Sequence, residues 1–382
     1  MNANEIKFRI LFVTGIVSPF WVELAAEINR DADFHFHIAF SLPTLGERGN
    51  HWKSFSANSV LYEVIPAAQD AESWLGGVFD TFRPTVAILG GVFSRHARVA
   101  AKLCRHHGIP FGYFGEQPNI SARFLQRLKL LRYRHELHSK KPDFLLAAGD
   151  RATDLYNNLV PPCCKVVFYP YYQDHSASFS IEKRSFAGPI RFLFSGRLIP
   201  RNSIKQLTLA FEELARLREG QFRWCISARG EEESFVRNVL SRCEALHKVT
   251  VFDRDFKEWS DRLRPFATSD VLVVPAVHSG WGLVVPEAMA VGLAVIATRE
   301  VEAARFFVEE MVNGLFVKPE KDSILEALIF CVDHPETVYE MGKNSCKAAV
   351  RGDVTVGAER FRRLISRWYG TRGCVEPANG RG

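Results

Sequence analysis

The stretch Asp270–Thr298 reads DVLVVPAVHSGWGLVVPEAMAVGLAVIAT, and its layout decides the fold. An apolar run ends at Val274 and predicts a buried strand. A loop with two glycines follows, and Pro286 then stands where a proline at the first position of a helix belongs. Gly292 is typical of the residue just past a helix end, and Ala294–Ala297 is a second buried run. The stretch therefore predicts a strand–loop–helix–strand unit of a parallel sheet.

The loop of this unit has a chemical use as well. A glycine-containing loop that leads into a helix leaves backbone N–H groups free, and such groups can hold a phosphate. Glu287 falls in the predicted first helical turn, where its carboxylate could accept hydrogen bonds from a ribose diol. An ordinary crossover with incidental glycines explains the spacing equally well, so both interpretations stay open at this point.

Outward from this stretch, short apolar runs alternate with amphipathic segments along nearly the whole chain. Ser18–Pro19 predicts a helix start and Ser94–His107 a helix, and such alternation is typical of parallel sheets covered on both faces. Residues 173–189 have the composition of a linker. We expect an N-terminal domain over residues 1–175, a second over 190–355, and a final helix over 356–370 that packs back toward the first. The expected strands are Phe8–Val13, Phe34–Phe40, Val60–Ile65, Val86–Leu89, Pro110–Phe114, Phe144–Ala147, Ile190–Ser195, Phe222–Ser227, Val249–Phe252, Val271–Val274, Ala294–Ala297 and Gly314–Val317, with a break at Thr14–Gly15 after the first.

Composition excludes several classes of protein. The chain has 382 residues, 47% of them hydrophobic, and a formal net charge of +6. This is enough for two domains of about 150–200 residues each. No stretch of about 18 residues is apolar and uncharged, so no membrane span is predicted. The eight cysteines form no Cys-x-x-Cys pair and stand beside no histidine cluster, so we expect reduced thiols and a cytoplasmic protein.

The segment 279–297 resembles the signature of the family-four retaining glycosyltransferases, in which two glutamates are separated by seven residues. The resemblance implies the GT-B fold, an α/β architecture of two Rossmann-like domains whose parallel sheets face a central cleft. It further implies that the second glutamate, Glu287, binds the ribose of a nucleotide-sugar donor and that the backbone of Gly282–Val284 contacts the diphosphate and sugar. The matching residues are Trp281, Gly282, Leu283, Val284, Glu287, Ala288, Met289, Ala290, Gly292, Val295 and Ile296.

A second segment, Phe192–Phe211, is similar to the first strand–loop–helix of the donor domain in this family. By this resemblance Gly196 and Arg197 lie at the diphosphate, where a guanidinium can neutralise charge on the leaving group. A surface ion pair is the other interpretation of Arg197 alone. Weaker similarities run over Val301–Val317 and Leu146–Asp174.

The sequence also departs from the family. Ser279 replaces the first glutamate, Asn202 replaces the diphosphate lysine, and Glu302 replaces a glycine. Neighbouring groups could compensate for these losses. We therefore include in the predicted donor site Arg201, Lys205, His278, Ser279 and Gly280, and, for the base, Arg254 and Phe256.

In the N-terminal half, Glu116 ends a strand where many relatives carry a histidine that faces the reacting sugar. It is a candidate residue for the acceptor or the donor sugar, although a helix-capping carboxylate explains it equally well. Gly15, after the first strand, is a second acceptor-side candidate, with a plain tight turn as the alternative. The predicted catalytic residues are thus Arg197, Glu287 and Glu116.

Residues 121–141 carry seven Lys/Arg against one Glu, interleaved with leucines and aromatics. An amphipathic basic helix of this kind can lie on an anionic membrane, and it could also be a helix with a solvated basic face. No nucleic-acid module accompanies it, so nucleic acid is not expected as a partner.

The resemblance implies a retaining glycosyltransferase of the hexosyltransferase type. It would use a nucleotide-sugar donor and a glycan or lipid-linked acceptor, with no cofactor and no metal, in cell-surface polysaccharide or glycolipid synthesis. It would work in the cytoplasm or at the inner face of the membrane. Two alternatives remain: a non-catalytic partner subunit that keeps the fold, and a nucleotide-sugar 2-epimerase.

Overall fold

The computed structural model describes residues 7–42, 62–65, 70–118, 123–181, 188–255 and 259–370. The chain forms two compact units, and each contains one parallel sheet. Unit 1 comprises residues 1–174 together with 353–382, and unit 2 comprises residues 175–352. Among the described residues no helix is both long enough and apolar enough to cross a membrane.

Unit 1 is built on a seven-stranded parallel sheet with the order β3-β2-β1-β4-β5-β6-β7. Its strands are rich in Phe, Val, Ile and Leu and are covered on both faces, as parallel strands require. The strands are β1 (Phe8–Ile16), β2 (Phe34–Leu42), β3 (Tyr62–Val64), β4 (Val86–Gly90), β5 (Phe111–Glu116), β6 (Phe144–Ala148) and β7 (Lys165–Phe168).

Alternate residues of β1 divide between the two cores of unit 1, because side chains alternate across a strand. Ile10 and Phe12 pack with helices α1 (Pro19–Ile28) and α16 (Val354–Tyr369). Leu11 and Val13 pack with the helices of the opposite face. Those helices are α3 (Ala71–Phe82), α4 (Arg95–His106), α6 (Asp150–Asn157) and, through Leu137, α5 (Arg123–Lys140).

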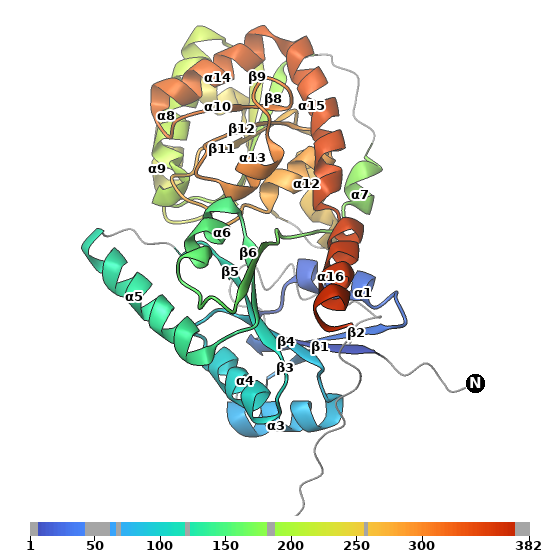
Figure 1. Cartoon of the computed structure of the whole chain (residues 1–382). Coiled ribbons are helices and arrows are strands. Elements are labelled where there is room, and N and C mark those ends of the chain that lie inside the picture. The colour runs from blue at the N-terminus through green and yellow to red at the C-terminus, as the bar shows by residue number, and fades with distance from the viewer. Residues whose placement is uncertain are drawn as a thin grey trace, which may run out of the picture. The chain divides into compact units, whose positions relative to one another are not determined.

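Helix α16 belongs to unit 1, although it follows all of unit 2 in the chain. It lies beside α1 in Figure 1. The Tyr169 hydroxyl donates to the Gly357 carbonyl over 3.0 Å, and Arg362 donates to the Glu27 carbonyl over 2.9 Å. A Cβ on Gly357 would lie 2.3 Å from the ring of Tyr172, so only glycine permits this approach.

Unit 2 contains a six-stranded parallel sheet with the order β10-β9-β8-β11-β12-β13. Strands β8 and β9 pair in register from Ile190↔Phe222 to Arg197↔Arg229. The strands are β8 (Ile190–Arg197), β9 (Phe222–Arg229), β10 (Thr250–Phe252), β11 (Val271–Val274), β12 (Ala294–Ala297) and β13 (Gly314–Phe316).

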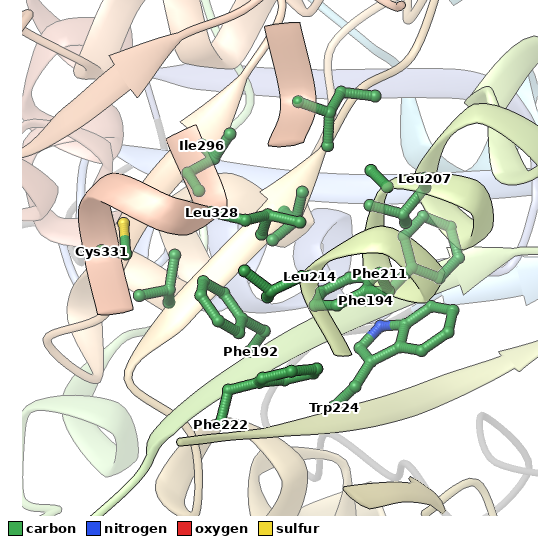
Figure 2. Close-up of a cluster of buried hydrophobic side chains, with 14 of the residues drawn as sticks. Phe192, Phe194, Leu207, Phe211, Leu214, Phe222, Trp224, Ile296, Leu328 and Cys331 are labelled. Carbon is green, nitrogen blue, oxygen red and sulfur yellow. The ribbon is translucent and has the colours of Figure 1, made fainter. Parts of the chain in front are cut away.

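One face of the unit 2 sheet carries a large aromatic core (Figure 2). The rings of Phe211 and Trp224 stack 4.3 Å apart, and Phe192 meets Phe211 edge to face. Stacked and edge-to-face pairs of this kind add to the burial of apolar area. The helices of unit 2 are α7 (Ser176–Phe179), α8 (Ile204–Leu217), α9 (Glu233–Arg242), α10 (Glu244–Val249), α11 (Arg264–Ala267), α12 (Val284–Ala290), α13 (Glu302–Phe307), α14 (Lys321–Asp333) and α15 (Pro335–Ala349), with 3-10 turns at η1 (Pro200–Asn202), η2 (Trp259–Leu263) and η3 (Val350–Gly352).

Several predicted boundaries were wrong. The first strand does not break at Thr14–Gly15, because β1 stays paired with β2 through Ile16↔Leu42. Strand β8 likewise runs on to Arg197, and β7 was missed altogether. Pro286 is the third residue of α12 rather than the first. Proline fits there because the first helical turn needs no N–H donor from it. Gly292 does follow the helix, with a φ of +82°.

Candidate active site

The strand order of unit 2 creates a switch point beside β8. From β8 the chain moves outward to β9 and then returns to the other side of β8 as β11. In open parallel sheets, ligands bind outside the carboxyl ends of the strands at such a point. The backbone ties the loops there together: Val277 donates to the Arg201 carbonyl over 2.8 Å, and Glu232 donates to the Leu198 carbonyl over 2.9 Å.

The loop after β8 presents two arginines to solvent. Arg197 ends the strand and Arg201 lies in the 3-10 turn η1, and both are exposed. Neither guanidinium has an ion-pair partner within the part of the chain that the structure describes. Gly196 precedes them with a φ of +152° and open space around its Cβ position. Two uncompensated cations on one short loop can attract an anion.

Asn202, at the position where the resemblance places a lysine, is half-buried in this loop. Its side-chain amide donates to the Arg197 carbonyl over 2.7 Å. The side chain is therefore used to close the loop on itself. It fixes the backbone that carries Arg197 instead of supplying a charge.

Lys205 lies in the first turn of α8, close to the same edge of the sheet. Its ammonium is 3.7 Å from a carboxylate oxygen of Glu232 and 5.7 Å from the centre of the Phe235 ring. The lysine side chain is 58% exposed and the glutamate side chain 8%. Arg197, Arg201 and Lys205 thus bring three cations to the carboxyl edge of β8.

The loop after β11 is held against the start of α13. Ser279 donates its N–H to the Glu300 carbonyl over 3.1 Å, and the carbonyl of Trp281 accepts from Ala303 over 2.9 Å. Gly282 has a φ of +102°, and a Cβ there would meet Val301 at 2.8 Å. Glycine is therefore required at this position, both for its conformation and for the close approach. His278 and Gly280 are half-buried in the same loop.

Helix α12 begins directly after this loop. The Val285 N–H donates to the Gly282 carbonyl over 3.0 Å. The N–H groups of Gly282, Leu283 and Val284 have no acceptor among the residues that the structure describes. Glu287 is half-buried one turn into the helix. The loop thus combines three free N–H donors with one carboxylate.

Arg254, predicted to contact the base, forms an ion pair with Glu233. Its guanidinium donates to the two carboxylate oxygens over 2.6 and 3.0 Å, and also to the Ala228 carbonyl. The hydrogen bonds from Arg254 lower the pKa of Glu233 to about 2. Arg254 therefore ties the end of β10 to α9. Phe256 lies outside the described residues.

Glu116 is the last residue of β5 in unit 1, and tyrosines hold it from two sides. The Tyr171 hydroxyl donates to its carboxylate over 2.7 Å, and the Tyr156 hydroxyl donates to its carbonyl over 3.0 Å. Burial and the carboxylate of Glu116 raise the pKa of Tyr171 well above its ordinary value. Tyr171 contacts the rings of Trp21 and Phe114 at 5.3 and 5.0 Å. Glu116 is exposed but well oriented.

The structure gives no special reason for glycine at Gly15, whose Cβ position is open. The close approach at this edge of unit 1 is at Gly90, where a Cβ would lie 2.4 Å from the Thr14 hydroxyl. The sequence reasoning missed Glu232 and Tyr171. Glu232 follows a strand, which was a usable signal. Tyr171 meets Glu116 only through tertiary packing.

Among the described residues, no group of three His, Cys, Asp or Glu side chains is placed to hold a metal ion. The groups that the site offers to a ligand are cations, backbone N–H groups and single carboxylates. These suit an anionic ligand that also carries hydroxyl groups, such as a nucleoside diphosphate.

Comparison with solved structures shows the fold over 94% of the chain. Sucrose-phosphate synthase from Thermosynechococcus elongatus superposes with a TM-score of 0.70 at 14% identity, over 94% of this chain and 99% of that one. HepE from Anabaena, solved in complexes with UDP and with UDP-glucose, gives a TM-score of 0.71 at 16% identity, over 94% of this chain and 100% of that one. The chain has the GT-B fold of two Rossmann-like domains.

The sequence comparisons fall mainly on unit 2. Residues 178–348 match the family model described as glycosyl transferases group 1. An uncharacterised glycosyltransferase of Methanocaldococcus jannaschii is 28% identical over 133 residues, which make up 35% of this chain and 33% of that protein. The chain thus spans about a third of the length of that relative.

Proposed function

We propose that this protein is a metal-independent, retaining glycosyltransferase. It transfers a sugar from a nucleoside-diphosphate sugar to a glycan or lipid-linked acceptor, in the cytoplasm, for a cell-surface polysaccharide or glycolipid. The observation that carries the proposal is the meeting of three cations and three free N–H groups at the switch point of unit 2. The matching family and the complexes of HepE with UDP and UDP-glucose support it.

In the proposed complex, Arg197 and the N–H groups of Gly282, Leu283 and Val284 bind the diphosphate, and Glu287 accepts hydrogen bonds from the ribose hydroxyls. These groups stabilise negative charge as the bond between the sugar and the phosphate breaks. His278, Ser279, Gly280 and Trp281 belong to the same loop, and their roles at the donor sugar remain a prediction.

Retention in this proposal comes from attack on the face that the leaving group departs from. The acceptor hydroxyl oxygen bonds to the anomeric carbon as the carbon–phosphate oxygen bond breaks. The hydroxyl proton passes to the departing phosphate oxygen, so the step balances without an enzyme nucleophile. The protein then contributes mainly position and charge stabilisation.

The acceptor side of the proposal rests on Glu116, which Tyr171 orients at the carboxyl edge of the unit 1 sheet. Helix α5 would bring the enzyme to a lipid-linked acceptor. Leu128 and Leu131 are 57% and 61% exposed on this helix, and Arg127, Lys129 and Arg132 are exposed around them. Apolar and basic side chains together suit an anionic lipid surface.

The proposal predicts that one family of nucleotides stabilises the protein against heat. UDP, GDP or ADP at about 100 times its dissociation constant should add roughly 2.7 kcal/mol to the free energy of unfolding. Thermal melts measured with each nucleotide and its common sugar conjugates test this. Arg197→Ala and Glu287→Ala should reduce the stabilisation. No stabilisation by any of the three nucleotides would contradict the proposal.

A second candidate function, a non-catalytic partner subunit, is favoured by Ser279 and by Asn202, whose side-chain amide donates to the Arg197 carbonyl. The double variant Ser279→Glu/Asn202→Lys separates the two. A weakened enzyme should gain hydrolysis or transfer of a UDP-sugar, measured as UDP release, whereas a protein without catalytic function should gain none.

A further inference from the structure

Glu232 is a buried carboxylate with few partners. Its side chain is 8% exposed, and one oxygen is 3.7 Å from the Lys205 ammonium. The other oxygen has no hydrogen-bond partner in the described parts of the chain. Burying a carboxylate against one distant cation costs stability rather than adding to it. A glutamate at this position is therefore poorly explained by a need of the fold.

The backbone around Glu232 packs closely against the loop after β8 and is hydrogen-bonded to it. Gly230 has a φ of +156°, and a Cβ there would lie 2.4 Å from the Leu198 carbonyl oxygen. The Glu232 N–H donates to that same carbonyl over 2.9 Å, and Leu198 donates to the Arg229 carbonyl over 2.9 Å. The carboxylate of Glu232 consequently starts from a rigid position beside the first turn of α8.

We propose that Glu232 is a positioning residue that fixes the Lys205 ammonium at the carboxyl edge of β8, where Lys205 supplies the diphosphate contact that Asn202 cannot make. This inference rests on the proposed function. Asn202 is committed to the Arg197 carbonyl, so the nearest lysine to that position along the chain is Lys205. The Lys205 side chain is 58% exposed and can reach a ligand, whereas the Glu232 side chain is only 8% exposed.

Restricting the lysine side chain before the ligand binds should increase the affinity for that ligand. A free lysine side chain loses much rotational freedom when it is immobilised on a phosphate. The carboxylate of Glu232 and the ring of Phe235 confine the ammonium before the ligand arrives. Less freedom is then lost on binding, and the contact becomes stronger.

The test is a double-mutant cycle with Lys205→Ala, Glu232→Gln and the double variant. Binding is measured by calorimetry for UDP, GDP and ADP and for the matching nucleosides. With the nucleotide that binds the wild type best, Lys205→Ala should weaken diphosphate binding about tenfold or more. Glu232→Gln should weaken it about threefold to tenfold. Nucleoside affinity should not change, because the contact is to phosphate.

Two further results distinguish positioning from a role in folding. In the Lys205→Ala background, Glu232→Gln should have no further effect on binding. The melting temperature of the single variant Glu232→Gln should equal or exceed that of the wild type, because this change removes a poorly compensated buried charge. The control is Glu244→Gln, which removes the same charge from an exposed pair with Lys248 on α10.

The outcomes separate this inference from the function it rests on. If no nucleoside diphosphate binds the wild type, both the inference and the proposed function are overturned. If diphosphates bind but Glu232→Gln has wild-type affinity, or weakens binding equally with and without Lys205, only the role of Glu232 is overturned.

Discussion

Arg254 and Glu233 form a doubly hydrogen-bonded ion pair near the switch point of unit 2. Two hydrogen bonds join them, and their side chains are 13% and 23% exposed. Arg237 donates to the same carboxylate over 2.8 Å. A paired and partly buried carboxylate of this kind contributes to stability, in contrast to most surface ion pairs. Its contribution should depend on pH.

Glu233→Gln should destabilise the protein at neutral pH by about 1–3 kcal/mol. The hydrogen bonds from Arg254 lower the folded-state pKa of Glu233 from 4.5 to about 2. The contribution is therefore complete above pH 4.5 and is lost as the pH falls toward 2. Urea unfolding at pH 7, 5, 4 and 3 should show the gap between wild type and variant closing. Glu231→Gln, an exposed neighbour, is the control, and a gap independent of pH would refute the assignment.

At the scale of single residues, the sequence predicted which side chains stand near the strand ends but not their partners. Arg197 and Arg201 are exposed at the predicted edge. Arg254 follows β10 as expected, and its ion-pair partner Glu233 was not predicted. Pairings of this kind depend on the turn between strand and helix, which no local pattern specifies. The donor roles of these residues stay predictions.

Helix α5 is the element whose sequence and structure both suggest binding to a membrane surface, which can be tested. Between Arg127 and Lys140 only Leu137 is fully buried. A helix that buries so little of itself gains little stability from packing. Its two exposed leucines are therefore stronger evidence for a binding surface than single surface leucines usually are.

Leu128→Ser together with Leu131→Ser should weaken binding to vesicles about tenfold or more, because two apolar side chains no longer enter the lipid interface. Co-sedimentation with vesicles of mixed neutral and anionic phospholipid measures this. Leu217→Ser, on the exposed side of α8, is the matched control at 47% exposure. Binding by the wild type should also fall as salt is added. Equal sedimentation of the wild type and the double variant would rule out this role of α5.

At the scale of elements, the periodicity of apolar residues located most strands, and β11 and β12 were predicted to the residue. The ends of β1, β5 and β8 were missed because Gly15, Gly115 and Gly196 look like strand breakers in the sequence. In the structure these strands continue because each pairs with a neighbour. At Gly115 a larger residue would meet the Tyr156 hydroxyl at 2.7 Å. Glycine there marks close packing and not a turn.

Across the whole molecule, unit 1 is assembled from two distant parts of the chain. Helix α16 reaches the unit 1 sheet after the chain has passed through unit 2, and the contact of Gly357 with Tyr172 fixes it there. The sequence analysis expected a returning helix over residues 356–370 but named no contact that would hold it. The contact itself depends on a glycine whose role no helical pattern reveals.

Gly357→Ala should destabilise unit 1 by about 1–3 kcal/mol, because the added methyl group overlaps the ring of Tyr172. Hydrogen exchange followed by mass spectrometry should show faster exchange in α16 and α1, with α14 of unit 2 unchanged. Gly76→Ala in α3 is the matched control. Its Cβ meets nothing within 4 Å, so this change should be neutral or stabilising. Faster exchange in both units would contradict the division described here.

The return of the chain at Asp353 has a consequence for how the protein is made on the ribosome. Residues 1–174 emerge first, but α1 alone covers the face of their sheet that it shares with α16 until 178 further residues, His175–Gly352, and then α16 itself have been synthesised. At roughly 5–20 residues per second this interval lasts on the order of ten seconds or more. Unit 2 is continuous and can fold within it. During this interval the nascent first unit lacks the cover that α16 gives to aromatic side chains such as Phe36 and Tyr169.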